Sequence, residues 1–344
     1  MRKKIVTQPL LVAGLGFIVV MLAASFIHMG FFDSYVAKTP YLYDSDNNMV
    51  GAPFAPFDYS ILGTDFNGNH LIYYILKGAK YTILGAFSIG LVSFFVAFLI
   101  GVPLGFKFKG TAKVVENTIS VLYFIPASLI AYNLLKPLLW QPFEGFPTSL
   151  AFRLTLEVLV ISMLLIPPAA ILIASETSVI LKRDFVISSR VLGGNPFHLF
   201  RYHLFPHLKH SLINLFTRQT IQAILVMTHL GVFELFFGGT LVDYSLMGSR
   251  PVPVTYDWAS LIGMYYYNLQ THAPWLVGIP LIFLVLFVLS LLGIARGVKN
   301  IITPPLLPAG LRTKAQTEKS TEPQLNPSNF IMVSGSNSHK ENHG

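Results

Sequence analysis

Residues 182–210 read KRDFVISSRVLGGNPFHLFRYHLFPHLKH and form the longest charge-bearing stretch between two strongly apolar ones. The pattern predicts a short helix from Asp184 to Leu192, which the Gly-Gly-Asn-Pro sequence at residues 193–196 then breaks. A second helical piece, from Phe197 to Phe205, is expected to end at Pro206. The basic residues and histidines of the stretch are Lys182, Arg183, Arg190, Arg201, Lys209, His198, His203, His207 and His210. A polar helix–turn–helix between apolar runs predicts a docking element at the membrane surface.

The composition is that of a protein that crosses a membrane several times. Of its 344 residues 53% are hydrophobic and only 12% are charged, whereas a soluble domain carries about 25% charged residues. Apolar runs long enough to span a bilayer occur at residues 9–32, 81–106, 114–135, 154–175, 212–237 and 275–292. We therefore predict an all-α membrane protein with six transmembrane helices.

The distribution of basic residues predicts the orientation of these helices. With the amino terminus inside, 18 of the 24 Lys and Arg residues fall on the cytoplasmic side, as the positive-inside rule requires. Both termini and the 182–210 stretch then face the cytoplasm. The net charge of +8 does not indicate nucleic-acid binding, because the charges lie in short loops beside apolar runs.

The 182–210 stretch resembles the cytoplasmic coupling loop of binding-protein-dependent ABC importer permeases of the dipeptide/oligopeptide/nickel branch. The motif of that family is Glu-Ala-Ala, three residues, Gly, nine residues, and Ile-x-Leu-Pro. Here Ile187-Ser188-Ser189, Gly193 and His203-Leu204-Phe205-Pro206 stand at the matching positions. The glycine and the proline agree with the motif, whereas Ile187 replaces the glutamate and serines replace both alanines.

Further strings that resemble this branch occur in the expected order along the chain. They are Leu62-Gly63-Thr64-Asp65, Tyr256-Asp257-Trp258, Ala273-Pro274-Trp275 and Leu292-Gly293. The resemblance therefore extends from about Leu62 to Pro304. It implies four segments: an N-terminal transmembrane anchor (1–32), an extracytoplasmic segment (33–80), a permease core (81–304) with the coupling loop (182–210), and a disordered cytoplasmic tail (305–344). The polar composition of the tail independently predicts its disorder.

The resemblance implies the type I ABC importer permease fold and ATP-driven uptake by alternating access in a bacterial cytoplasmic membrane. The implied partners are a second, similar permease in a heterodimer, two cytoplasmic ATPase subunits, an extracytoplasmic solute-binding protein, and membrane lipid. The solute is left open among dipeptides, longer peptides, nickel and others. The residues expected to act in coupling are Asp184, Ile187, Ser188, Ser189, Arg190, Gly193, Gly194 and Pro206.

The chemistry expected of the chain itself is limited. The sequence has no Gly-x-x-x-x-Gly-Lys-Ser/Thr segment for phosphate binding, so ATP is expected only in the partner subunits. No catalytic constellation and no complete metal-ligand set is recognisable, so neither an enzyme nor a metal site is expected. His229 and Glu234 lie deep in their predicted span, where they either line a pathway or form hydrogen bonds between helices. Glu157 and Arg218 lie near span ends, where snorkelling to the surface is expected.

Two other kinds of function remain open. An ion-coupled secondary transporter would need no ATPase, and it is expected to show inverted repeats with broken helices in both halves. A membrane sensor or scaffold with a diverged permease fold would explain the departures from the coupling motif. Recovery of ATPase and solute-binding subunits with the chain would distinguish an importer from both.

Overall fold

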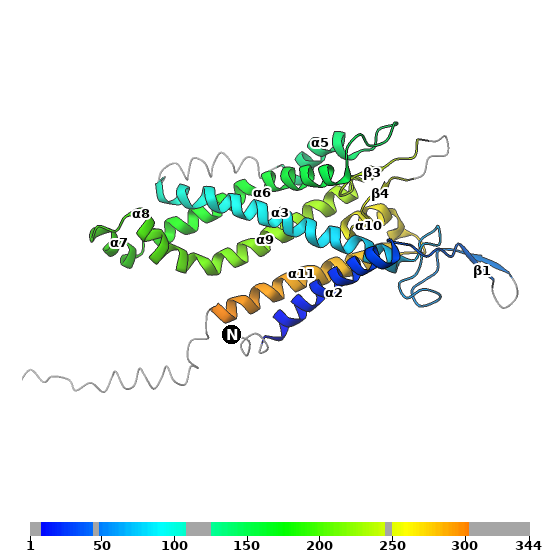
Figure 1. Cartoon of the computed structure of the whole chain (residues 1–344), viewed down its shortest axis with the longest axis horizontal. Helices are drawn as coiled ribbons and strands as arrows, with labels where there is room; N and C mark the ends of the chain where they lie inside the picture. The colour runs from blue at the N-terminus through cyan, green and yellow to red at the C-terminus, as the bar shows by residue number, and fades with distance from the viewer. Residues whose placement is uncertain (1–7, 44–47, 108–124, 245–249, 303–344) are drawn as a thin grey trace, which may run out of the picture. The chain divides into compact units, whose positions relative to one another are not determined.

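The computed structural model describes residues 8–43, 48–107, 125–244 and 250–302 (Figure 1). Its helices are α2 (Pro9–Phe32), α3 (Leu71–Lys107), α5 (Ala127–Leu139), α6 (Leu150–Leu181), α7 (Asp184–Val191), α8 (Pro196–His198), a π-helical turn (Leu199–Leu204), α9 (Phe205–Val232), α10 (Trp258–Tyr265), a 3-10 turn (Tyr266–Gln270) and α11 (Trp275–Ile302). Its strands form two antiparallel pairs, β1 (Tyr41–Tyr43) with β2 (Met49–Gly51) and β3 (Thr240–Leu241) with β4 (Val252–Pro253).

Four of the described helices, α2, α3, α6 and α11, are long and apolar enough to cross a membrane. The fifth long helix, α9, equals α11 in length at 28 residues. It carries more polar residues along its middle, among them Arg218, Gln219 and Gln222. Of the span predicted at residues 114–135, only the part that begins α5 is described, because residues 108–124 lie outside the described ranges. The predicted tail at 305–344 lies outside them as well.

The long helices α3, α6, α9 and α11 contact one another near their midpoints. The Phe87 ring of α3 lies 5.9 Å from Phe287 of α11 and 6.2 Å from Phe216 of α9, measured between ring centroids. Half a turn further along α3, the Ser162 hydroxyl of α6 donates a hydrogen bond to the Ile89 carbonyl over 3.2 Å. Because these residues lie near the middle of their helices, they mark the middle layer of the bundle.

Glycines bring the first turns of α2 into backbone contact with α11. A Cβ atom at Gly14 would lie 2.6 Å from the Ser290 carbonyl oxygen, and one at Gly293 would lie 2.8 Å from the Leu10 carbonyl oxygen. Small residues of this kind allow close helix approach in membranes. The two helices run antiparallel, so Pro9 and Ile302 lie at the same end of the bundle (Figure 1).

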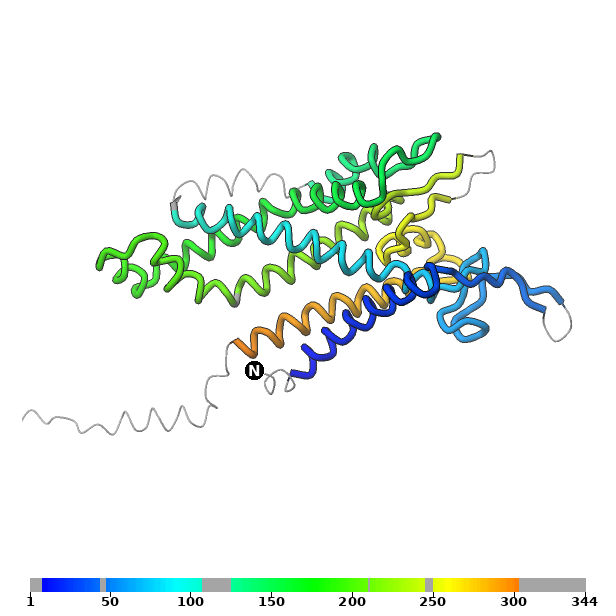
Figure 2. Tube along the Cα trace, viewed as in Figure 1, coloured from blue at the N-terminus to red at the C-terminus, as the bar shows by residue number. Residues whose placement is uncertain are grey.

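The bundle has two different ends. Figure 2 shows the green α7–α8 segment projecting at one end, where α6 ends and α9 begins. The β1–β2 and β3–β4 pairs and α10 lie at the opposite end (Figure 1). This separation agrees with the placement of the coupling loop and of the aromatic 238–274 segment on opposite sides of a membrane.

Two helix boundaries differ from those predicted. α3 begins at Leu71 rather than Tyr81, because the amphipathic residues before Tyr81 continue the same helix. α9 begins at Phe205 and ends at Val232, whereas the predicted span ran from 212 to 237. The shift places Arg218 near the middle of α9.

The buried helix in the aromatic stretch after residue 255 was not predicted. α10 packs between α9 and α11, and its Trp258 side chain is completely buried. The Trp258 indole N–H donates to the Ile75 carbonyl over 3.0 Å, and the Trp258 backbone N–H donates to the Thr82 hydroxyl over 2.9 Å. This short helix therefore ties α3, α9 and α11 together at the end of the bundle opposite α7.

Candidate functional site

The end residues of α7 stabilise the helix and the turn that follows it. Asp184 lies in the first turn of α7 and Arg190 in the last. At these positions each charge interacts favourably with the helix dipole. Gly193 follows with a φ of +88°, which only glycine adopts without strain. The Gly193 N–H bonds to the Arg190 carbonyl over 3.1 Å, and the Gly194 N–H to the Ser189 carbonyl over 3.0 Å. The predicted helix and its glycine turn are confirmed.

The helical piece after this turn does not end at Pro206, so that prediction is wrong. Asn195 caps the new helix by accepting a hydrogen bond from the His198 N–H over 2.7 Å. The chain then forms the π-helical turn, in which the Phe205 N–H bonds to the Phe200 carbonyl. Pro206 lies in the first turn of α9, where a proline is tolerated because its missing N–H needs no partner. The loop is therefore continuous with α9.

One buried side chain and one ring contact hold α7 against the bundle. Val186 is buried in an apolar cluster with Leu204 and Leu208. The Phe185 ring stacks on the His207 ring of α9 at 5.0 Å between centroids. Val186 and Phe185 therefore join α7 to the start of α9.

Several large apolar side chains of the coupling loop are exposed, beside its exposed charged residues. Ile187, Val191, Leu192 and Phe197 are exposed by 48%, 81%, 88% and 69% respectively. We call these four residues the docking tip. Exposed apolar groups in such proximity mark an interaction surface, and Ile187 contributes to it at the position where the family motif has glutamate. Ser188 and Ser189 lie on the same helix, exposed and half-buried.

The two predicted pathway residues lie at the end of α9 rather than deep within a span. His229 is exposed in the last turn of α9. Glu234 follows the helix in a left-handed conformation, with a φ of +59°, and is half-buried. Neither residue lines the large cavity between α5, α6 and α9. Their role in a pathway remains a prediction.

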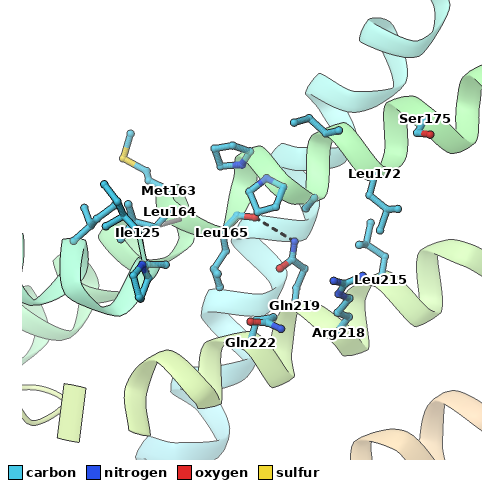
Figure 3. A pocket seen from close by; sticks show the side chains of 17 residues that line it. Ile125, Met163, Leu164, Leu165, Leu172, Ser175, Leu215, Arg218, Gln219 and Gln222 are labelled. Atoms are coloured by element: carbon cyan, nitrogen blue, oxygen red, sulfur yellow. Dashed lines mark hydrogen bonds between the residues drawn. The ribbon is translucent and has the colours of Figure 1, made fainter. Parts of the chain in front are cut away.

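That cavity has a volume of about 600 Å³. Its walls are formed mainly by apolar side chains of α5 and α6, including Pro167 and Pro168. Figure 3 shows Arg218, Gln219 and Gln222 rising from α9 on the other side. The Gln219 amide donates to the Leu165 carbonyl of α6 over 3.3 Å. The arrangement gives an apolar chamber with one polar wall.

Arg218 lies at the mid-depth of the bundle, so its predicted place near a span end is wrong. It is two residues from Phe216, which contacts Phe87 in the middle layer, and two from Thr220, which approaches Gly90 of α3. The error arose from the predicted start of the span at residue 212, because α9 begins at Phe205. Its side chain lines the cavity between α5, α6 and α9.

Glu157 lies near the beginning of α6, but snorkelling does not explain it. Its side chain is 1% exposed, and its carboxylate accepts a hydrogen bond from the Gly238 N–H over 2.8 Å. The neighbouring Arg153 donates to the Gly238 carbonyl over 2.7 Å and to the Thr148 carbonyl over 2.5 Å. Arg153 also lies 3.8 Å above the Phe146 ring. The two side chains therefore hold Gly238, which follows α9, through both its N–H and its carbonyl group.

Replacing Glu157 by leucine is expected to destabilise the protein, because the buried Gly238 N–H would lose its acceptor. Such a loss costs about 1–3 kcal/mol. Glu157→Gln has nearly the same shape as the wild-type side chain and keeps an acceptor oxygen. Its free energy of unfolding is expected to lie within about 1 kcal/mol of the wild-type value. Thermal unfolding in detergent measures both variants. Equal stability of the leucine and glutamine variants would contradict the hydrogen bond between Glu157 and Gly238.

The strings that carried the family resemblance meet at the end of the bundle that carries α10. The Asp65 carboxylate accepts hydrogen bonds from the Asn67 and Asn69 backbone N–H groups over 2.9 and 2.7 Å, and from the Tyr265 hydroxyl over 3.2 Å. The Trp275 indole N–H points to the Thr64 carbonyl at 3.5 Å. Burial, followed by the Asp65 charge, raises the pKa of the Tyr265 phenol well above its ordinary value. These hydrogen bonds join the segment before α3 to α10 and α11, so the residues of the resemblance have a structural role.

Asp257 caps α10 from a buried position. Its carboxylate accepts from the Ser260 N–H over 3.1 Å and contacts the Ser260 hydroxyl. Burial raises the pKa of Asp257, and the hydrogen bonds from Ser260 oppose that rise. Among the residues that the structure describes, no group of three or more His, Cys, Asp or Glu side chains could hold a metal ion. The side chain of His210 is outside that description.

Membrane-length apolar helices, a polar-walled cavity at mid-depth and a docking tip at one end together define the membrane subunit of a transporter. Residues 97–306 match the family of binding-protein-dependent transport system inner membrane components. Because the match covers more than half of the chain, the chain belongs to this family. The type I permease fold predicted from the sequence is thereby confirmed, and so is a multi-pass location in the inner membrane.

Two relatives have names that describe a transported solute. The chain is 25% identical over 267 residues to a peptide transport system permease protein, SapC, of Escherichia coli, which covers 76% of this chain and 81% of that protein. It is 22% identical over 246 residues to a di/tripeptide transport system permease protein, DppC, of Pseudomonas aeruginosa, with 72% of each chain covered. Both proteins are transport subunits, and the chain is similar to them over most of its length.

Proposed function

We propose that this chain is one of two permease subunits of an ATP-driven importer that carries peptides into the cytoplasm. The observation that supports this most strongly is the docking tip on a loop that is continuous with α9. The same helix forms the polar wall of the cavity. Peptides are proposed as the solute because two relatives are named as peptide and di/tripeptide permeases.

The coupling mechanism follows from the rigidity of α9. At 28 residues and 1.5 Å per residue, α9 is about 42 Å long. A partner that binds the docking tip and moves it would tilt or shift α9 through the Val186 and Phe185 contacts. That movement would carry Arg218 and Gln222 with it and alter the cavity walls. The ATPase must bind the two conformations with different affinity for such coupling to occur.

The partners follow from this mechanism. Two ATPase subunits would bind ATP, since this chain has no phosphate-binding loop of the P-loop type. A second, similar permease would close the cavity, and a solute-binding protein would deliver peptide at the end that carries α10 and the strands. In this assembly both termini and the coupling loop face the cytoplasm, as the bias of basic residues favours. The whole is proposed as a heterodimeric permease with no cofactor bound in this chain.

Uptake of radiolabelled trialanine by cells tests the proposed function. Cells that lack this chain are expected to lose most of the uptake, and a plasmid copy is expected to restore it. Depletion of ATP with the proton gradient maintained is expected to stop the restored uptake. Uptake that follows the proton gradient instead would support a secondary transporter, and uptake unchanged by loss of the chain would support a scaffold.

A further inference from the structure

Arg218 is a charged group in the middle layer of the bundle. A charge at the bilayer centre is expensive, and such groups face a cavity or pair with an opposite charge. Arg218 lines the cavity at the depth of the Phe87, Phe216 and Phe287 ring contacts. Its position therefore requires a partner that neutralises it.

The chain itself provides no such partner in the part that the structure describes. No Asp or Glu occurs among the described residues that line the cavity. Within the same ranges, Arg218 makes neither an ion pair nor a hydrogen bond. The nearest acidic residue along α6 beyond the cavity wall, Glu176, is already bonded to the Ser211 hydroxyl at 2.6 Å. Among the described residues, no carboxylate therefore competes with a molecule that enters the cavity for the positive charge of Arg218.

The residues beside Arg218 define the shape of that molecule. Gln222 lies four residues further along α9, and residues at this spacing share one face of a helix. Gln219 is occupied by its bond to Leu165, whereas the Gln222 amide has no partner among the described residues. A guanidinium with a neighbouring amide donor suits a planar carboxylate, which arginine binds through two parallel hydrogen bonds.

The remaining surface of the cavity suits the rest of a short peptide. Among the described residues, the lining apart from Ser175 and the α9 residues is apolar, with Ile130, Met163 and Leu172 among its members. Apolar walls accept varied side chains without requiring specific hydrogen bonds. A volume of about 600 Å³ lies within the range of small-molecule sites, roughly 300–1,000 Å³.

We propose that Arg218, assisted by Gln222, binds the terminal carboxylate of a peptide as it passes through the cavity. The proposal rests on the proposed function and deepens it by assigning a peptide-binding site inside the membrane. An anionic lipid headgroup is not the ligand, because headgroups lie at the membrane surface and Arg218 lies at mid-depth.

Direct binding to the purified permease–ATPase complex, without the solute-binding protein, tests the site. Labelled trialanine and its C-terminal amide are compared by equilibrium dialysis. The wild-type complex is expected to bind the free acid about tenfold or more tightly than the amide, since hydrogen bonds to charged groups are the strong ones. Arg218→Gln is expected to abolish that preference, and Arg218→Lys to retain part of it. Arg296→Gln, which removes an exposed arginine of α11 outside the cavity, is the matched control and is expected to behave as wild type.

An unchanged preference in Arg218→Gln, or no preference in wild type, would overturn the proposal. Native mass spectrometry of the same samples provides a second readout. Separation of the two permeases in Arg218→Gln alone would show that Arg218 pairs with the second subunit, which also overturns it. The preference for the free acid over the amide can be absent while the wild-type protein, supplied with its solute-binding protein, still takes up trialanine. In that case the proposed function stands without this site. If wild type takes up no trialanine, the proposed function itself fails.

Discussion

Leu192→Asp is expected to detach the ATPase subunits from an otherwise folded permease. Leu192 is 88% exposed at the end of α7, so the change removes no contact that holds the fold together. In a docked complex, burial of a leucine contributes about 1.5–3 kcal/mol. A carboxylate in its place would be desolvated without a partner, which adds a further penalty. Together these terms lower the affinity by roughly a hundredfold or more.

Copurification from solubilised membranes measures this effect, with vanadate-sensitive ATPase activity recorded on the same sample. Phe143→Asp is the matched control, because Phe143 is 81% exposed and lies after α5, away from the docking tip. The control is expected to retain its ATPase subunits. Full recovery of ATPase subunits with Leu192→Asp would show that the docking tip is not the surface they bind.

Gly263→Ala is expected to prevent stable folding of the permease. A Cβ atom at this position would lie 1.9 Å from the Gly231 carbonyl oxygen and 2.1 Å from the Gly231 carbonyl carbon. Since these are backbone atoms, no side-chain rotation can relieve the overlap. α10 would have to move away from α9, with loss of packing around the buried Trp258. The expected cost exceeds about 4–5 kcal/mol, a range reached by few single substitutions.

Gly278→Ala is the matched control for this effect. Gly278 lies within α11 and has no atom within 4 Å of the position of an added Cβ. Alanine in the interior of a helix is favoured over glycine by roughly 0.5–1 kcal/mol, so this variant is expected to be as stable as wild type or slightly more so. Monodisperse yield and thermal unfolding in detergent are the measurements. A Gly263→Ala protein that unfolds at the wild-type temperature would contradict the close approach of α9 and α10.

Local sequence signals predicted the coupling loop well. The helix from Asp184, the turn at Gly193 and the break at residues 193–196 depend on neighbouring residues, and the structure has all three. Pro206 was misassigned because a proline ends one helix and begins another equally well. In the structure the π-helical turn that precedes Pro206 continues directly into α9, so the proline begins a helix here.

The features that sequence reasoning missed depend on distant contacts. Glu157 and its partner Gly238 are 81 positions apart, so nothing near Glu157 reveals that it is buried and bonded. Arg218 was placed near a span end because apolar runs mark where a helix is hydrophobic, not where it begins. The polar first turns of α9 extend the helix and move Arg218 to its middle. The polar wall formed with Gln222 became visible only through the packing of α9 against α6.

Cross-linking from the docking tip tests the central claim most directly. The chain has no cysteine, so Leu192→Cys introduces a single attachment point for a photoactivatable thiol reagent. In native membranes, mass spectrometry of the cross-linked product is expected to identify an ATP-binding subunit, and Phe143→Cys is expected to give no such product. If Leu192→Cys is fully labelled by the reagent and yields no adduct with an ATP-binding protein, the account of this chain as an ATP-driven permease is contradicted.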